Sequence, residues 1–294
     1  MNQPLDIQTT LQAAQLQLIE VGLTDSPRLD TELLLAHALQ ESRTHLFTWP
    51  DKLLNTTQTA KFQTLLELRL QGQPIAHILG EREFWGLNLK ITQDTLIPRP
   101  DTETIVDAVL ALHSQHKNCA SNKNEQGGVS ILDLGTGSGA IALALKSELN
   151  NATVTAVDFS EKALKVAIEN ASTHKLAINF LKSDWFSAID SEQRFNYIVS
   201  NPPYIEAADP HLQQGDIRFE PITALTAGED GLEDIRQIVQ QGKSHLTSSG
   251  WLLIEHGFNQ AESVANIFSQ NGFLAIHLFE DLGGNPRITI GQKA

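Results

Sequence analysis

The stretch "ILDLGTGSGAIALAL" (131–145) sets three glycines between an apolar strand pattern and an apolar helix pattern. Gly135, Gly137 and Gly139 permit positive φ and let a ligand approach the backbone closely, beside the positive end of the following helix. Asp158 ends the next strand pattern, near the offset of about twenty residues at which a carboxylate accepts ribose hydroxyls. The stretch predicts a nucleotide-binding loop in an α/β fold. The alternative is a tight turn followed by an exposed aspartate.

The spacing of the glycines separates the candidate ligands. Dinucleotide sites favour G-x-G-x-x-G, whereas this loop reads G-x-G-x-G with Asp133 two residues ahead of the first glycine. A carboxylate there would repel a nearby pyrophosphate but suits a ligand with an amine or sulfonium charge. S-adenosylmethionine has both groups and a ribose. The loop therefore favours a methyl donor over the nicotinamide cofactor of a dehydrogenase.

Strand and helix patterns alternate from residue 129 onward. Alternation of this kind predicts a mostly parallel sheet covered by helices on both faces. The predicted strands are 129–134, 152–158, 178–184, 195–200, 250–256, 273–280 and 287–292, and the predicted helices are 139–149, 160–174, 231–246 and 259–272.

The first 80 residues carry helical patterns, which predict a small bundle. The predicted helices are 9–23, 28–39 and 55–72, the second opened by Ser26 as a cap and Pro27 at the first helical position. A period-two pattern around 84–91 predicts a hairpin, and the polar run 114–128 predicts a loop. We expect a helical docking domain over 1–80, a hairpin linker over 81–100 and the α/β domain over 101–294.

Composition narrows the function classes. The 294 residues are 41% hydrophobic and 19% charged, with a net charge of 21 − 35 = −14, which argues against binding bare nucleic acid through phosphate contacts. A single cysteine, Cys119, cannot form an internal disulfide, so we expect a reducing, cytoplasmic location and no structural zinc. The sequence contains no run of about 18 apolar residues, so we expect no membrane span, and it indicates no signal peptide or metal site.

A second candidate contact follows the third strand pattern of the α/β domain, in "KSDWF" (182–186). This position belongs to the sheet edge where ligands gather. We expect Trp185 to cover an adenine face and Asp184 to accept a hydrogen bond from the adenine amino group. The alternative is a buried tryptophan without a ligand role.

The stretch "YIVSNPPYIE" (197–206) ends the fourth strand pattern with a stiff backbone. Consecutive prolines cannot continue a central strand, because each lacks a ladder donor and fixes its own φ. Asn201 offers a side-chain carbonyl, Pro202 a main-chain carbonyl of fixed direction, and Tyr204 an aromatic face. Methylation of an amide nitrogen requires such prearranged acceptors for the NH₂ hydrogens, with the nitrogen held in line with the methyl group. The alternative is a proline turn that merely closes the strand.

Five stretches together resemble one family. "DLGTGSGAIAL", "SDWF", "SNPPYI", "QQGDIRFEPITAL" and "LIPRPDTE" look like the HemK/PrmC family, the release factor glutamine methyltransferases, and the likeness covers nearly the whole chain. Asn-Pro-Pro-Tyr alone is shared with adenine-N6 DNA methyltransferases, whereas the combination with "PRPDTE" and "GDIRFEP" is far more specific. Where the family has "PRPETE", this chain has the conservative Asp101.

The resemblance implies a class I, Rossmann-like S-adenosylmethionine-dependent domain and N5-methylation of the glutamine in the Gly-Gly-Gln motif of peptide-chain release factors. The release factors would be the partners, and the helical bundle a docking element. The implied donor site comprises Gly135, Thr136, Gly137, Ser138, Gly139, Asp158, Asp184, Trp185 and Asn201. The implied substrate site comprises Asn201, Pro202, Pro203 and Tyr204, of which Asn201, Pro202 and Tyr204 are the expected catalytic residues.

Three other functions stay open from the sequence. They are an adenine-N6 nucleic-acid methyltransferase, a non-catalytic S-adenosylmethionine-binding module and a dehydrogenase. The acidic net charge argues against the nucleic-acid methyltransferase, and the presence of Asn201 and Tyr204 argues against the non-catalytic module. The glycine spacing argues against the dehydrogenase. For Arg218 and Glu220, a structural ion pair and a substrate contact stand as equal alternatives.

Overall fold

A seven-stranded sheet carries the C-terminal two thirds of the chain in the computed structural model, which describes residues 5–119 and 128–294. The strand order is β5-β4-β3-β6-β7-β9-β8, and the first five of these strands are parallel while β9 and β8 are antiparallel to their neighbours. The strands are β3 (Ser130–Leu134), β4 (Thr153–Asp158), β5 (Asn179–Lys182), β6 (Phe195–Ser200), β7 (Leu246–Glu255), β8 (Leu274–Glu280) and β9 (Pro286–Gln292).

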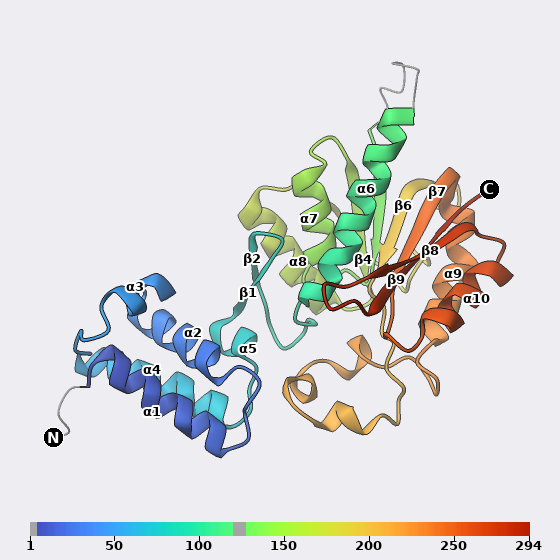
Figure 1. Cartoon of the computed structure of the whole chain (residues 1–294). Coiled ribbons are helices and arrows are strands. Elements are labelled where there is room, and N and C mark those ends of the chain that lie inside the picture. The colour runs from blue at the N-terminus through green and yellow to red at the C-terminus, as the bar shows by residue number, and fades with distance from the viewer. Residues whose placement is uncertain (1–4, 120–127) are drawn as a thin grey trace. The chain divides into compact units, whose positions relative to one another are not determined.

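Helices flank the sheet (Figure 1). The order runs outward from β3 to β5 in one direction and from β6 to β7 in the other. Right-handed crossovers therefore place the helices of the two halves on opposite faces. The helices are α6 (Glu103–Cys119), α7 (Ala140–Glu148), α8 (Glu161–His174), α9 (Glu233–His245) and α10 (Ala261–Gln270). The reversal of direction between β3 and β6 creates the crevice in which ligands of such sheets bind.

The predicted strands and helices of this domain are confirmed, and one predicted loop is wrong in part. Residues 114–119 continue α6 instead of forming a loop, while residues 120–127 of the predicted loop lie outside the described residues. Ile105, Val106 and Val109 are fully buried and stabilise the start of α6. A helix that is already nucleated extends at little cost through polar residues. Polar composition therefore failed to mark its end.

The helical part forms a separate compact unit, which comprises Met1–Glu81 together with His211–Phe219. Its buried core includes Ile7, Leu18, Leu34, Leu35 and Phe62. The helices are α1 (Ile7–Glu20), α2 (Pro27–Leu39), α3 (Arg43–Thr48), α4 (Thr56–Leu70) and α5 (Ile75–Leu79), and the returning segment contains the short 3₁₀ turn Asp216–Phe219.

Local capping explains where these helices begin. Asp6 caps α1 through the Thr9 N–H at 2.7 Å, and Asn55 forms a reciprocal capping box with Gln58 at the start of α4. Ser26 is the N-cap residue of α2 and Pro27 its first residue, as predicted, but the Ser26 side chain makes no capping hydrogen bond. Its hydroxyl donates instead to the Asp30 carboxylate at 2.8 Å.

The predicted hairpin is also present, as β1 (Glu81–Phe84) and β2 (Leu87–Lys90). Its two turn residues, Trp85 and Gly86, both have positive φ, as a tight two-residue hairpin turn requires. None of the described helices is long and apolar enough to cross a membrane.

Candidate active site

A cavity of about 520 Å³ lies where β3, β4, β5 and β6 end. Each of these strands delivers a predicted site residue to it: Gly135 after β3, Asp158 at the end of β4, Asp184 after β5 and Asn201 after β6. The volume falls within the roughly 300–1,000 Å³ typical of small-molecule sites. The sheet edge thus gathers residues that are up to 66 positions apart in the chain.

The glycine loop adopts the geometry that its sequence demands. Gly135, Gly137 and Gly139 have φ of +71°, +56° and +87°, which only glycine adopts readily. A Cβ on Gly139 would lie 2.7 Å from Leu143 Cδ1, so this glycine also permits close packing at the start of α7. Gly135 and Gly137 line the cavity.

Asp133 lies beneath the loop rather than facing a ligand. It is fully buried, and its Oδ2 accepts from the Thr136 hydroxyl at 2.6 Å and from the Ala142 N–H at 3.2 Å. The carboxyl group therefore satisfies one of the free N–H groups in the first turn of α7. Burial raises its pKa to about 7. The expected electrostatic contact with a ligand is replaced by a structural role in holding the loop.

Asp158 links the loop to the next element. Its Oδ2 accepts from the Gly137 N–H at 2.8 Å and its Oδ1 from the Ser160 N–H at 2.8 Å. Burial raises the pKa of this carboxyl group, while the two backbone bonds oppose that shift. A carboxylate oxygen can accept more than one hydrogen bond. Asp158 therefore retains the capacity to accept from ligand hydroxyls at the cavity wall.

Trp185 lies against the glycine loop. Its ring lies so close to Gly135 that a Cβ atom added to Gly135 would be 3.4 Å from Trp185 Cζ3. Its φ of +46° is unusual for a bulky residue, and the buried Ser183 supports this backbone by donating to the Trp185 carbonyl at 2.8 Å. Trp185 lines the cavity together with Asp184 and Asp234. Burial raises the pKa of Asp234, and hydrogen bonding from Trp185 opposes the shift.

The Asn-Pro-Pro-Tyr turn is held from both sides. The Tyr204 N–H donates to the Leu225 carbonyl at 3.2 Å, and the Tyr204 carbonyl accepts from Gln260 Nε2 at 2.9 Å. Gly231 lies so close to this turn that a Cβ atom added to it would be 2.3 Å from the main-chain carbonyl oxygen of Tyr204. The turn is therefore rigid because of its prolines and also because of its surroundings.

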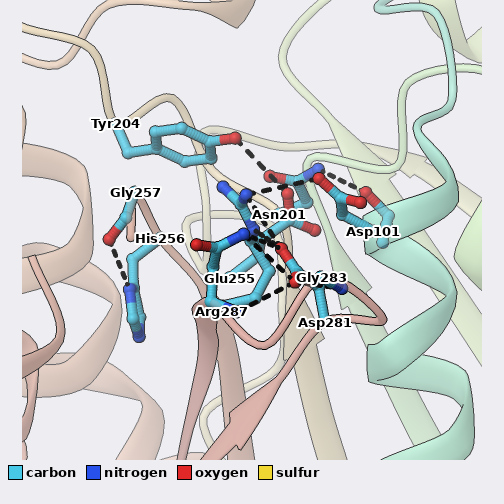
Figure 2. A network of polar contacts seen from close by, with 11 residues as sticks. Asp101, Asn201, Tyr204, Glu255, His256, Gly257, Asp281, Gly283 and Arg287 are labelled. Carbon is cyan, nitrogen blue, oxygen red and sulfur yellow. Dashed lines mark hydrogen bonds and ion pairs between the residues drawn. The ribbon is translucent and has the colours of Figure 1, made fainter. Parts of the chain in front are cut away.

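The side chain of Asn201 is directed by one hydrogen bond. Its Nδ2 donates to the Thr102 hydroxyl at 3.2 Å, and within the described part of the chain its Oδ1 accepts no hydrogen bond. The Tyr204 hydroxyl donates to Glu255 Oε1 at 3.4 Å. Burial raises the pKa of Tyr204 well above its usual value, so the phenol stays protonated at neutral pH. Figure 2 shows Asn201, Tyr204 and Glu255 beside Arg287, which pairs with Asp101 and Asp281.

The cavity brings together some of the predicted residues and leaves others behind its wall. Those that line it are Gly135, Gly137, Asp158, Asp184, Trp185, Asn201 and Pro203. The predicted residues outside this lining are Thr136, Ser138, Gly139, Pro202 and Tyr204. Thr136, Ser138 and Pro202 are buried, and Tyr204 packs against the core cluster of β6, β7 and α9.

Several residues of the site were not predicted from the sequence. Thr95, Leu96, Phe159 and Asp234 line the cavity, and Thr102 and Glu255 lie behind Asn201 and Tyr204. Glu255 is the last residue of β7, next to β6 in the sheet. A carboxylate at the carboxyl end of a parallel strand was therefore the available signal. No group of three or more metal-ligating side chains occurs among residues 5–119 and 128–294.

Of the two alternatives for Arg218 and Glu220, the structure contradicts an ion pair between them. The Glu220 carboxylate is buried, pairs with Arg99 and accepts from the Ile97 N–H at 2.8 Å. Arg218 donates to the Gln71 carbonyl at 3.4 Å and lies over the Phe219 ring. Neighbours in sequence thus have different partners, because each belongs to a different compact unit.

Comparisons with known proteins agree on one family. The PrmC N-terminal domain model matches residues 9–80, and the methyltransferase small domain model matches residues 111–216. The release factor glutamine methyltransferase of Pseudomonas aeruginosa is 49% identical over 92% of this chain and 95% of its own length. That of Vibrio cholerae is 47% identical over 97% and 96%.

A solved methyltransferase structure from Pyrococcus furiosus has a TM-score of 0.51 at 18% identity, covering 79% of this chain and 98% of that chain, which shows a shared fold. The relatives match across both the helical unit and the sheet domain, at identities well above those that fold similarity alone gives. The chain belongs to the release factor glutamine methyltransferase family.

Proposed function

We propose that this chain transfers a methyl group from S-adenosylmethionine to the N5 side-chain amide of the glutamine in the Gly-Gly-Gln motif of peptide-chain release factors. The observation that carries the proposal is the free Oδ1 of Asn201, which belongs to a rigid turn at the same cavity as the glycine loop. An acceptor fixed in this way suits an NH₂ group that must be held for in-line attack.

The residues around the cavity fit the proposed donor. Asp158 has carboxylate capacity for ribose hydroxyls, and the positive-φ glycines leave the loop backbone open to close approach. Asp184, Trp185 and Phe159 would surround an adenine. Bound there, the donor would supply an electrophilic methyl group, so the chain needs no metal or redox group for the reaction.

The protein groups then act on the acceptor amide. Asn201 Oδ1 and the Pro202 carbonyl would accept the two amide hydrogens, which leaves the nitrogen lone pair facing the methyl group. Tyr204 would offer its ring to the flat amide. The raised pKa of Tyr204 argues against its action as a base. No strong base is required, because the nitrogen loses its proton readily after methyl transfer.

The helical unit would serve as a docking element for the release factor, with further contacts on the sheet domain. Its exposed apolar side chains include Leu16, Phe47, Trp49 and Leu53. These side chains would supply apolar area for a contact with the release factor. We propose a cytoplasmic location on the basis of this substrate class.

Two alternatives, an adenine-N6 nucleic-acid methyltransferase and a non-catalytic donor-binding module, are not favoured. The relatives at 44–49% identity carry a release factor name over nearly their whole length. The acidic net charge of −14 also disfavours a nucleic-acid substrate.

Asn201→Ala tests the proposal. We expect turnover on a purified release factor to fall by about 10²- to 10³-fold, the usual effect of removing one prearranged polar contact, with donor affinity largely kept. Asn196→Ala is the matched control, because Asn196 lies at the opposite end of the same strand, where it binds Ser130. Undiminished turnover in Asn201→Ala would disprove the acceptor role.

A further inference from the structure

A buried carboxylate joins two segments that line the cavity. The Glu220 side chain is 0% exposed and pairs with the Arg99 guanidinium through Oε1. Its other oxygen, Oε2, accepts from the Ile97 N–H at 2.8 Å. Leu96, immediately before Ile97, and Pro221, immediately after Glu220, both line the cavity. All of these residues belong to the sheet domain, so one carboxylate fixes two stretches of the cavity wall to each other.

The Arg99 side of this pair leads to Asn201. The Arg99 carbonyl accepts from the Thr102 N–H at 3.1 Å and so closes the short 3₁₀ turn Pro100–Thr102. Thr102 is 4% exposed, and its hydroxyl oxygen accepts from Asn201 Nδ2 at 3.2 Å. The position of Arg99 therefore sets where the Asn201 amide nitrogen finds its acceptor.

The Glu220 side of the pair leads to Tyr204. Glu220 is followed by the 3₁₀ turn Ile222–Ala224, which the Leu225 N–H extends by donating to the Ile222 carbonyl at 3.0 Å. The Leu225 carbonyl accepts from the Tyr204 N–H at 3.2 Å and from the Ile205 N–H at 2.9 Å. A displacement of Glu220 would therefore be passed through one compact turn to the backbone of Tyr204.

Stability alone does not account for a carboxylate that is buried so completely. Taking it out of water costs free energy that the attraction to Arg99 only partly returns, and apolar side chains of similar volume often stabilise a protein as well or better. Charge-assisted hydrogen bonds are directional, whereas apolar contacts are not. Glu220 is thus suited to fixing the relative position of two segments.

We propose that Glu220 is a positioning residue, which together with Arg99 closes a frame around the Asn-Pro-Pro-Tyr turn. The frame consists of the Arg99–Glu220 pair, Thr102 bound to Asn201, and Leu225 bound to Tyr204. It holds both ends of the turn in the geometry that the acceptor amide requires. The inference rests on the proposed function, because that function defines the amide as the acceptor.

The test compares Glu220→Gln, Arg99→Met and Arg99→Lys in release factor methylation at saturating donor and release factor. We expect the first two to lower kcat by about 10- to 100-fold, the scale of a small misplacement at a reacting group. The loss is partial because Arg287 still pairs with Asp101 of the same 3₁₀ turn, at 3.3 Å (Figure 2). Arg99→Lys should keep most of the wild-type kcat, because one guanidinium nitrogen makes the contact and an ammonium group can replace it.

Two further readouts separate positioning from stability. In an Asn201→Ala background, Glu220→Gln should lower kcat far less than it does in the wild type, because the main group that it positions is already absent. Donor affinity, measured by calorimetry, should change by less than about threefold in each variant, since the frame includes neither the glycine loop nor Asp158.

Glu32→Gln is the control for removing a buried, ion-paired carboxylate. The Glu32 side chain is 3% exposed and pairs with Arg28 and Arg43 in the helical unit. This variant should lose stability in urea but keep the wild-type kcat at saturating release factor. Circular dichroism checks that each variant is folded, and Arg99→Met with Arg99→Lys decides the question if Glu220→Gln is not.

The outcomes separate this inference from the proposed function. No methylation of a release factor by the wild type would contradict the proposed function itself. Wild-type methylation with an unchanged kcat in Glu220→Gln and in Arg99→Met would overturn the positioning role alone. A loss in Arg99→Lys as large as in Arg99→Met, an equal loss in Glu32→Gln, or losses that multiply fully with Asn201→Ala would overturn it as well.

Discussion

Asp158→Asn should damage donor binding although it hardly changes the shape of the side chain. Both carboxylate oxygens accept backbone hydrogen bonds at 2.8 Å, Oδ2 from Gly137 and Oδ1 from Ser160. An amide has one acceptor oxygen, so one of the two N–H groups must face an NH₂ group. Either the glycine loop or the start of α8 is therefore released, and the negative charge at the cavity wall is lost.

The size of the effect follows from the lost bond. A hydrogen bond to a charged group contributes about 1.5–3 kcal/mol. Because about 1.4 kcal/mol corresponds to a tenfold change in affinity, donor binding should weaken roughly 10- to 150-fold. If a ribose hydroxyl of the donor also loses its hydrogen bond to the carboxylate, the loss of affinity should lie toward the upper end of this range.

Calorimetric titration with S-adenosylmethionine measures the effect directly. Glu161→Gln is the matched control, because Glu161 lies three residues further along, is exposed and pairs with Lys182 at 2.8 Å. Its affinity for the donor should equal that of the wild type. Wild-type affinity in Asp158→Asn, or an equal loss in both variants, would refute the assignment of Asp158.

Two further predictions concern stability. Arg69→Met should destabilise the helical unit by about 3–5 kcal/mol, since it leaves the buried Asp30, now paired at 2.7 Å, without its cation. Arg28→Met should cost at most about 1 kcal/mol because Arg28 is 71% exposed and its buried partner Glu32 keeps a second cation, Arg43; urea unfolding compares the two variants, and equal costs would contradict the reasoning. Burial raises the pKa of Asp133 from 3.8 to about 7, so its contribution to stability is present below about pH 4 and is lost as pH rises through 7. Asp133→Asn has no carboxyl group to ionise, so its free energy of unfolding should rise relative to that of the wild type by about 2–4 kcal/mol between pH 4 and 8. If the free energies of unfolding of the two proteins, measured in urea, changed in parallel with pH, the raised pKa of Asp133 would be refuted.

The regular part of the fold was predictable from sequence because its signals are local. The alternation of patterns after residue 129 predicted each strand of the large sheet, and the apolar spacing of α1, α2 and α4 predicted the bundle. The end of α6 was not predictable in this way. Its residues 114–119 are polar, so they carry no apolar period, and the helix continues because its buried first turns have already formed.

The site was predictable where one motif supplies both backbone and side chain. Gly135, Asp158 and Asn201 were predicted to meet, because each follows a parallel strand, and the structure brings them to one cavity. Pairings between motifs were not predictable. Glu220 binds Arg99 across 121 positions, and Thr102 meets Asn201 across 99, which no local pattern encodes.

The most direct test of the proposed function is methyl transfer from labelled S-adenosylmethionine to a purified, unmethylated release factor. A factor whose Gly-Gly-Gln glutamine is replaced runs alongside, and mass spectrometry of the digested products locates the methyl group. We predict label on the wild-type factor alone, on the side chain of that glutamine. Label on neither factor, with the donor still bound, would contradict the proposal and direct the next assay to adenine-containing DNA.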